Sequence, residues 1–288
     1  MDLMPAPFIV GVGRSGTTLL RLMLDAHPDV AIPAETHFVP KLLGLRDEGD
    51  ALRAATHSVM TAESTWADFG IPSERLAEAF ARLSPFTLAD GLRAFYGLYA
   101  AKFAKPRWGE KTPFYGRRMP AIEAVLPEAH FVHVIRDGRD VALSLRPLWF
   151  SPGERIETQA QNWLTKVSAI RANGKGCRQY LEIRYEDLVL DTESVVRRVC
   201  EFIALPYDPR MLSYHQSARN RLDEIGDDYR FKDMPISKEA RLGLHVKALH
   251  PPDPARVARW RSDMSTGDRE TFTSIAGGLL ADLGYPLS

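Results

Sequence analysis

The sequence has few cysteines and no long apolar stretch, and both shortages argue against whole classes of protein. Cys177 and Cys200 are its only cysteines, so we expect no disulfide framework and no zinc site, and both thiols are predicted to be buried and reduced. No run of about 18 uncharged apolar residues is present, which argues against a membrane-spanning helix. The amino end also lacks the basic start of a secretion signal. We therefore expect a cytoplasmic protein without a membrane span.

Net charge is absent as well. The 37 lysine and arginine residues balance the 37 aspartate and glutamate residues, so no overall field attracts nucleic acid or an anionic membrane. The eight histidines are scattered, without a pair at zinc-binding spacing beside a cysteine, so we expect no metal. With 288 residues, 45% of them apolar, the chain is long enough for one large domain over residues 1–288. A homodimer stays open at this stage.

The segment FIVGVGRSGTTLL, residues 8–20, predicts an anion-binding loop. An apolar strand runs into a glycine-rich turn, and a helix begins near Gly16. Glycine lets the backbone approach an anion closely, and the free N–H groups at a helix start attract it. The ATP-binding version, G-x-x-x-x-G-K-[ST], has a lysine where this chain has Thr17, which leaves Arg14 as the cation of the loop. The loop favours one phosphate-like group with a transferable appendage over a triphosphate with magnesium; an ordinary strand-turn-helix corner is the alternative.

A second signal is FVHVIRDGRDVALS, residues 131–144, where a buried strand ends at an arginine. Ligands of such folds bind at the carboxyl ends of the strands. Kinases and GTPases typically place an aspartate for magnesium at the comparable strand end, whereas Arg136 makes this end cationic. The guanidinium fork is well suited to a phosphate. An ion pair of Arg136 with Asp137 or Asp140 is the structural alternative.

Short apolar runs alternate with helical patterns along the chain, which predicts parallel strands joined by helices. The expected fold class is α/β, a P-loop-like three-layer fold in which helices flank a central, mostly parallel sheet, with a helical insertion. The strands are expected at residues 7–12, 29–33, 107–110, 129–135 and 179–184. Further helices are expected at residues 137–146, 155–173, 191–204 and 267–282.

Two long segments stand outside this alternation. Residues 37–105 are expected to form a helical insertion, with Ser73 and Thr87 near helix starts. The insertion either walls an acceptor pocket above the strand ends or adds core. Residues 215–254 are charged and predict a lid-like excursion, because loops of that length inside compact domains usually serve function.

The run RSGTTLLRLMLDAHPDV, residues 14–30, resembles the 5′-phosphosulfate loop of sulfotransferases, and among these it is most similar in motifs to the tyrosylprotein sulfotransferases. These enzymes use 3′-phosphoadenosine 5′-phosphosulfate (PAPS) as co-substrate and release 3′-phosphoadenosine 5′-phosphate (PAP). Many of them have proline where this chain has glycine at position 13. The resemblance implies that the loop binds PAPS through Gly13, Arg14, Ser15, Gly16, Thr17 and Thr18.

The resemblance extends to later segments. In sulfotransferases an arginine and a serine eight residues later grip the 3′-phosphate, which implies this role for Arg136 and Ser144. The segment beginning at Tyr185, YEDL, and the pair Arg259-Trp260 resemble two further family elements, so Tyr185 and Arg259 are expected near the 3′-phosphoadenosine half. A structural role stays open for Ser144, and Trp260 is either a neighbour of the nucleotide or a core anchor.

Candidate catalytic residues follow two strand ends. In AETHF, residues 34–38, Glu35 and His37 project to the same side if the segment is extended. The resemblance implies that Glu35 is the general base and that His37 is a reserve base or orients the acceptor. In WGEKTP the resemblance gives Lys111, helped by Arg14, the task of stabilising the leaving phosphate during in-line transfer without a covalent enzyme intermediate. The alternatives are a paired carboxylate at Glu35, a packing role for His37 and a surface role for Lys111.

The expected function is transfer of a sulfonate from PAPS to the hydroxyl of a phenol, a sugar, a lipid alcohol or a peptide tyrosine, so the partner is a small-molecule, carbohydrate or peptide acceptor. Two rivals stay open. A P-loop small-molecule kinase is opposed by Thr17 and Arg136. A catalytically inactive nucleotide-binding scaffold would keep the loop and have no use for Glu35 and Lys111. Fold analogy does not identify the acceptor.

Overall fold

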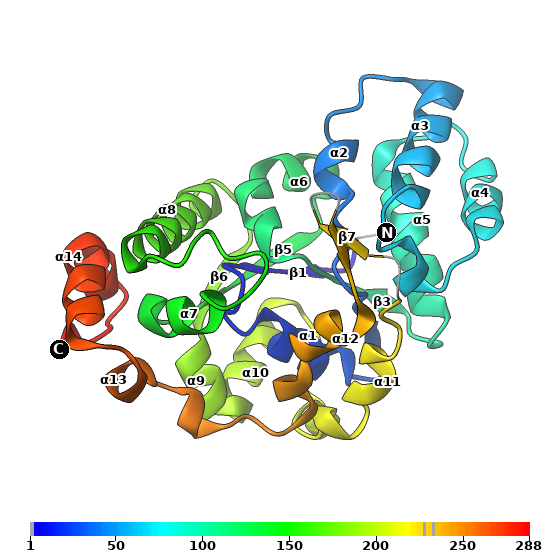
Figure 1. The fold of residues 1–288 in the computed structure, drawn as a ribbon. Helices are drawn as coiled ribbons and strands as arrows, with labels where there is room; N and C mark the ends of the chain where they lie inside the picture. The colour runs from blue at the N-terminus through cyan, green and yellow to red at the C-terminus, as the bar shows by residue number, and fades with distance from the viewer. Residues whose placement is uncertain (1–2, 227–228, 232–233) are drawn as a thin grey trace.

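A sheet of four parallel strands lies at the centre of the fold (Figure 1). The computed structural model describes residues 3–226, 229–231 and 234–288. The strand order is β4-β1-β5-β6, and every neighbouring pair is parallel. The strands are β1 (Ala6–Gly11), β4 (Glu110–Lys111), β5 (Ala129–Ile135) and β6 (Tyr180–Arg184), which confirms the mostly parallel sheet of the expected α/β class.

The expected strand over residues 107–110 is divided at Gly109. Its first half, β3 (Arg107–Trp108), pairs with β2 (Val30–Ala31), and its second half, β4, pairs with β1. A Cβ atom at Gly109 would lie 2.8 Å from Pro7 Cγ, so the strand changes partner where only glycine fits. The strand expected at 29–33 shrinks to two residues because the N–H of Ile32 donates to the Asp25 carboxylate at 2.9 Å instead of a strand.

Helices cover both faces of the sheet, because successive side chains of β1 point to opposite sides. Ile9 packs with α1 (Thr17–Asp25) and α10 (Thr192–Phe202), whereas Phe8 packs in a second cluster. A third buried cluster joins three helices. These helices lie on the side of the molecule where the chain ends (Figure 1). These are α7 (Gly138–Leu145), α8 (Ile156–Gly174) and α14 (Thr266–Asp282), and they match the expected helices to within a few residues.

Helices joined by short loops make up the insertion, and its described residues contain no strand. It contains α2 (Val39–Leu42), α3 (Gly49–Thr61), α4 (Ser73–Ala81) and α5 (Leu88–Ala101). Ser73 is the first residue of its helix, and the Thr87 side chain caps α5 by accepting the N–H of Asp90 at 3.1 Å. Aromatic side chains of the insertion belong to the same buried cluster as Phe8 and Phe131 of the sheet, so the insertion adds core.

The excursion over residues 215–254 folds back against the body. It contains α11 (Ala218–Leu222), the antiparallel pair β7 (Tyr229–Phe231) and β8 (Met234–Ile236), and α12 (Lys238–Gly243). Residues 227–228 and 232–233 of this expected excursion lie outside the described residues. The hairpin was not expected from the sequence. Two buried ion pairs fasten the excursion, Arg221 to Asp25 and Arg241 to Asp68.

The remaining helices connect these parts. They are α6 (Met119–Val125), which precedes β5, α9 (Tyr185–Leu190), which follows β6, and the short α13 (Trp260–Asp263). Among the described residues, no helix is both long enough and apolar enough to cross a membrane.

Candidate active site

The turn between β1 and α1 depends on glycine. Its backbone is left-handed at Arg14 (φ 72°) and at Gly16 (φ 94°). A Cβ atom at Gly16 would lie 2.4 Å from the ring of Tyr185, so a larger residue fits neither the conformation nor the space. The N–H groups of Gly16, Thr17 and Thr18 have no acceptor within the described part of the chain. These free donors at the start of α1 are suited to an anion.

A cavity of about 340 Å³ opens beside this turn, and we call it the basic cavity. Among the described residues that line it, five side chains are cationic and one, Asp253, is a carboxylate. This excess of positive charge suits a ligand with phosphate groups. The sequence indicated three of the cations but missed Lys247 and Arg256, which lie in a charged stretch without a motif. The five are Arg14, Arg136, Lys247, Arg256 and Arg259.

Arg136 stands directly after β5, with its guanidinium 4.3 Å from the ring centre of Tyr185. Its Nη1 donates to the carbonyl of Arg14 at 3.3 Å and its Nη2 to that of Arg256 at 2.8 Å. A carboxylate oxygen of Asp140 lies 3.7 Å from Nη2, so the ion pair of the alternative interpretation exists as a long contact. The Nε atom is buried and has no partner within the described chain, so its donor is unsatisfied without a ligand.

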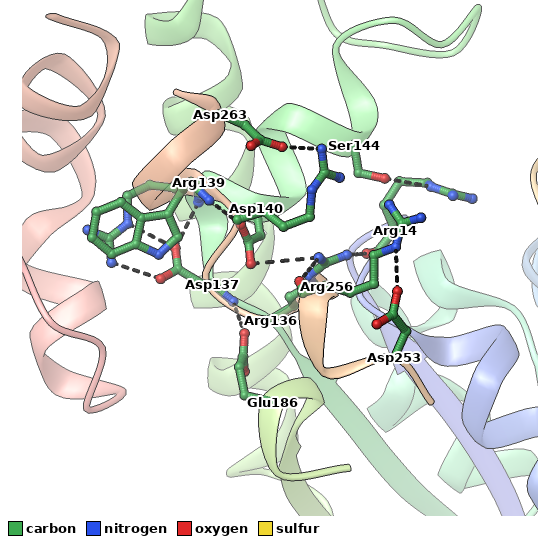
Figure 2. A network of polar contacts seen from close by, with 12 residues as sticks. Arg14, Arg136, Asp137, Arg139, Asp140, Ser144, Glu186, Asp253, Arg256 and Asp263 are labelled. Atoms are coloured by element: carbon green, nitrogen blue, oxygen red, sulfur yellow. Dashed lines mark hydrogen bonds and ion pairs between the residues drawn. The ribbon is translucent and has the colours of Figure 1, made fainter. Parts of the chain in front are cut away.

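Figure 2 shows the network that fixes the start of α7. Asp137 accepts from Nε and Nη2 of Arg139 at 3.0 and 2.8 Å, and its own N–H donates to Glu186 at 3.0 Å. Asp140 accepts the backbone N–H of Trp260 at 2.8 Å, and the Arg139 guanidinium lies 3.5 Å from the centre of the indole ring. Trp260 is therefore a buried anchor. It fixes the backbone beside Arg259, which lines the basic cavity.

Arg14 connects the turn to α7 and to the excursion. Its Nε donates to Ser144 Oγ at 3.2 Å, and its Nη1 donates to the carbonyl of Leu244 at 2.9 Å. Burial, followed by repulsion from Arg136, lowers the pKa of Arg14. An anion between Arg14 and Arg136 would relieve this repulsion, and Ser144 lines the same cavity.

Glu35 and Lys111 form an ion pair next to the turn. Lys111 Nζ lies 2.7 Å from Glu35 Oε1 and 3.5 Å from Thr18 Oγ1. His37 Nε2 lies 3.7 Å from the other carboxylate oxygen. Burial opposes ionisation of Glu35, but Lys111 and then His37 outweigh it and lower the pKa of Glu35 to about 2. The carboxylate is thus paired, as the alternative interpretation required, and its partner is the expected catalytic lysine.

A buried polar network holds the segment that carries Glu35. The Glu110 carboxylate accepts from Thr36 Oγ1 at 3.0 Å, from Thr112 Oγ1 at 2.6 Å and from Tyr96 Oη at 2.6 Å. Burial raises the pKa of Glu110 to about 7 against these hydrogen bonds. The residue types gave no sign of this network, because its members are contributed by three separate segments.

A larger cavity of about 570 Å³ lies on the other side of the ion pair, and we call it the aromatic cavity. Glu35, His37 and Lys111 line it. The described residues that line both cavities are Arg14, Thr17, Thr18, Leu244 and His245. The two cavities therefore meet at the turn and at the excursion.

His245 lines both cavities and was missed by sequence reasoning, since it stands in no motif. Burial, followed by Lys111, lowers the pKa of His245 to about 3, so its imidazole is neutral at physiological pH. Among the described lining residues, the insertion contributes only His37 and Thr65 to the aromatic cavity. The excursion and the segment around Trp149 provide more of the wall than the insertion, which differs from the expected arrangement.

The expected site residues converge on these two cavities, with one exception. Gly13 lines the aromatic cavity and Gly16 the basic cavity, together with Tyr185 and Arg259. Ser15 lines neither cavity: its side chain is buried, and its N–H donates to the carbonyl of Val12 at 3.2 Å, which closes the turn.

Comparisons with known proteins agree with this arrangement. A profile of the sulfotransferase family matches residues 5–209. Protein-tyrosine sulfotransferase A of Caenorhabditis elegans is 29% identical over 219 residues, which are 74% of this chain and 53% of that protein. The protein-tyrosine sulfotransferase of Drosophila melanogaster is 28% identical over 289 residues, which are 98% of this chain and 52% of that protein. The chain thus spans about half the length of these relatives.

A solved structure has the same fold. The sulfotransferase domain from the olefin synthase of Synechococcus PCC 7002 aligns with a TM-score of 0.60 at 22% identity, over 99% of this chain and 96% of that one. The likeness shows the fold, and the family profile covers well over half of the sequence. This chain belongs to the sulfotransferase family.

Proposed function

We propose that this chain transfers the sulfonate of PAPS to an acceptor hydroxyl. The observation that carries the proposal is the meeting of the two cavities at Arg14, Thr17 and Thr18, beside Glu35 and Lys111. A donor nucleotide in the basic cavity and an acceptor in the aromatic cavity would bring their reacting atoms together at that junction.

The basic cavity fits a nucleotide with two separate phosphate groups. The free N–H groups at Gly16, Thr17 and Thr18 suit the 5′-phosphosulfate. Arg136, with its unpaired Nε, suits the 3′-phosphate, as does Arg256 on the same cavity wall. Lys247 and Arg256, which the sequence did not indicate, thus add positive charge to the 3′-phosphate site expected at Arg136 and Ser144.

PAPS supplies a sulfonate whose bond to the bridging phosphate oxygen breaks as the acceptor oxygen bonds to sulfur, and the acceptor proton passes to Glu35. Lys111 lies between Glu35 and Thr18. A phosphate bound in the turn would therefore compete with Glu35 for the Lys111 ammonium. When Lys111 turns to the leaving phosphate, burial raises the pKa of Glu35 and makes it a stronger base. Arg14 is placed to balance charge on the same side.

The rival functions fit the same residues less well. A kinase needs a cation at position 17 and a carboxylate at the end of β5 for magnesium, where this chain has Thr17 and Arg136. An inactive scaffold has no need of the Glu35 and Lys111 pair at the junction. The relatives named as protein-tyrosine sulfotransferases keep a peptide tyrosine among the acceptors, beside a phenol, a sugar and a lipid alcohol.

Isothermal titration calorimetry tests the nucleotide. We expect PAP to bind at least tenfold more tightly than adenosine 5′-phosphate, because the 3′-phosphate adds charge-assisted hydrogen bonds at Arg136. Tighter binding of ATP with magnesium than of PAP would overturn the proposal in favour of a kinase. Glu35→Gln should abolish sulfonate transfer to a panel of phenols, sugars and tyrosine peptides while keeping the affinity for PAP; wild-type protein that binds PAP and sulfonates no member of the panel would support the scaffold.

A further inference from the structure

The aromatic cavity has walls suited to a planar ring. Trp149 lies 4.7 Å from Phe150 and 4.8 Å from Phe231, measured between ring centres, and 6.0 Å from Tyr229. Across the cavity, Phe114 is stacked on His37 with ring centres 5.4 Å apart. The volume of about 570 Å³ falls in the range of pockets that enclose small molecules. These walls favour a small aromatic ligand.

The cavity also contains more positive charge than sulfonate transfer needs. Among the described residues that line it, six side chains are cationic and one, Glu35, is a carboxylate. Four of the cations have protein partners within the described chain: Arg14 with Ser144 and Leu244, Arg21 with the carbonyl of Ile32, Lys111 with Glu35, and Arg241 with Asp68. The other two are Arg117, which is exposed, and Lys166, which is half-buried; neither forms an ion pair or hydrogen bond with the described residues, so both can pair with a ligand.

Arg117 lines the aromatic cavity together with Phe114. Both residues belong to the 3₁₀ helix η2 (Pro113–Arg117), in which residues three apart share a face and lie about 6 Å apart along the axis. Phe114 is stacked on His37, which is next to Glu35. Arg117 thus stands one turn of η2 after Phe114, whose ring is stacked on His37 next to Glu35.

Lys166 approaches the same end from α8. It lies one turn before Ile170, and both line the cavity, as expected for residues four apart on one helical face. Asn173 of α8 donates to the carbonyl of Gly116 at 3.2 Å, which fixes α8 against η2. Burial, followed by repulsion from Arg117, lowers the pKa of Lys166, so the positive charge of Arg117 acts on Lys166.

A further donor lines the same cavity. The indole Nε1 of Trp149 is buried and has no hydrogen-bond partner within the described chain. Buried donors are normally satisfied, so an unpaired one on a residue of the cavity wall can be matched by a bound ligand. Together with Arg117 and Lys166, Trp149 offers donors and no acceptor, which suits an anionic group.

We propose, on the basis of the proposed function, that the acceptor is a small aromatic alcohol that also carries a carboxylate or similar anionic group. Its hydroxyl lies at Glu35, its ring lies beside Phe114, and its anionic group binds Arg117 and Lys166. The hydroxyl and the anion are separated by at least one ring, because about 6 Å of helix axis separates Phe114 from Arg117. Arg117 and Lys166 repel each other, and an anion that binds to both removes this repulsion.

A matched pair of acceptors tests this inference. Sulfonation of 3-(4-hydroxyphenyl)propionate and of its amide is measured with PAPS, since the two differ only in charge at the end opposite the hydroxyl. We expect kcat/KM for the carboxylate to exceed that for the amide at least tenfold, mainly through KM. Arg117→Gln and Lys166→Met should each raise KM for the carboxylate about tenfold and leave KM for the amide and for PAPS unchanged. Arg118→Gln and Lys175→Met remove exposed charges outside the cavity and should change neither.

A binding measurement separates this inference from the proposed function. Quenching of tryptophan fluorescence should show 3-(4-hydroxyphenyl)propionate binding to the PAP-bound protein, with affinity lost in Lys166→Met. Equal binding and turnover of the carboxylate and the amide would overturn the inference, as would a tyrosine peptide that is preferred over both. In either of those cases PAP binding and sulfonate transfer stand, whereas failure of PAP to bind would remove the proposed function itself.

Discussion

The ammonium of Lys111 touches both halves of the site, since its Nζ lies 2.7 Å from the Glu35 carboxylate and 3.5 Å from Thr18 Oγ1 in the phosphate-binding turn. Because Lys111 is nearly buried, at 3% exposure of its side chain, water competes little for its charge. The lysine therefore links the binding of a phosphate in the turn to the basicity of Glu35.

Lys111→Met should raise the pKa of Glu35. Burial favours the neutral acid, and Lys111 is the main cause that lowers the pKa to about 2. Without Lys111 the balance reverses, so the carboxyl takes up a proton at a higher pH than in the wild type. Carbon-13 NMR of labelled glutamate in the free protein should show the Glu35 titration move upwards, and turnover should fall at least a hundredfold. A Glu35 titration unchanged by the substitution would contradict the coupling; Lys175→Met, on the exposed surface, is the matched control.

Arg136→Gln should weaken PAP binding by roughly tenfold to a hundredfold, the effect of losing one charged hydrogen-bonding partner. The affinity for adenosine 5′-phosphate should change much less, because that nucleotide lacks the 3′-phosphate. Titration calorimetry of both nucleotides measures the ratio. Arg146→Gln removes a cation that pairs with Asp268 and lies outside the basic cavity, so it should leave the ratio intact. Equal losses for the two nucleotides would assign Arg136 to the fold instead of the 3′-phosphate.

Gly16→Ala should disrupt the phosphate-binding turn. The backbone at φ 94° disfavours any residue with a Cβ atom, and that atom would lie 2.4 Å from the Tyr185 ring. Together these effects should destabilise the protein by about 2–4 kcal/mol and abolish measurable PAP binding. Thermal unfolding and calorimetry provide the two readouts. Gly267→Ala is the control, because no atom lies within 4 Å of its Cβ position and its φ is not left-handed; equal stability of the two variants would refute the steric argument.

Arg241→Met should loosen the excursion. Its partner Asp68 is buried and also accepts the N–H of Gly226 at 2.7 Å, so the substitution leaves a carboxylate without its counter-ion. Breaking a buried pair in this way costs about 3–5 kcal/mol. We expect faster proteolysis within residues 215–254, detected by mass spectrometry of the fragments. Arg219→Met removes an exposed cation on α11 and should leave the cleavage rate unchanged. Resistance of the Arg241 variant to cleavage would mean that other contacts hold the excursion.

His133 should contribute to loss of stability in acid. Burial lowers its pKa in the folded state from 6.5 to about 3. Between these values the unfolded chain binds a proton that the folded chain does not, so stability is complete above pH 6.5 and decreases as the pH falls towards 3. The slope from this one group is at most about 1.4 kcal/mol per pH unit. In His133→Phe, urea unfolding over this range should show a pH dependence weaker by up to one proton. Parallel curves for variant and wild type would exclude the contribution.

Several parts of the site were predictable because they depend on neighbours in the chain. The first N–H groups of any helix lack a partner within the helix, so the helix start after the glycine turn predicted free donors. The N–H groups of Gly16, Thr17 and Thr18 are such donors. The apolar run of β5 likewise predicted a buried strand with Arg136 at its end, and Arg136 follows Ile135, the last residue of β5. Thr87 followed by Asp90 carried the signal of a helix start, and the structure has that cap.

Other parts were not predictable from local patterns. The strand expected at 107–110 divides at Gly109 because Ile32 and Pro7 crowd its Cβ position, which is a consequence of packing. The antiparallel pair of β7 and β8 joins two strands of three residues each, which are too short to show a periodic pattern in the sequence. Lys247 and Arg256 reach the basic cavity only because the chain folds back over the turn.

The phosphate-binding turn, the cationic strand end and the α/β class follow from short stretches of sequence, because glycine conformation, apolar runs and helix starts act between neighbouring residues. Packing of distant segments pairs Lys111 with a carboxylate 76 residues away, makes the two cavities meet beside that pair, and brings Arg117 and Lys166 to the wall of one cavity. The strength of a charge depends on its burial and on which opposite charge lies within a few ångströms, and both are set only when distant segments pack together.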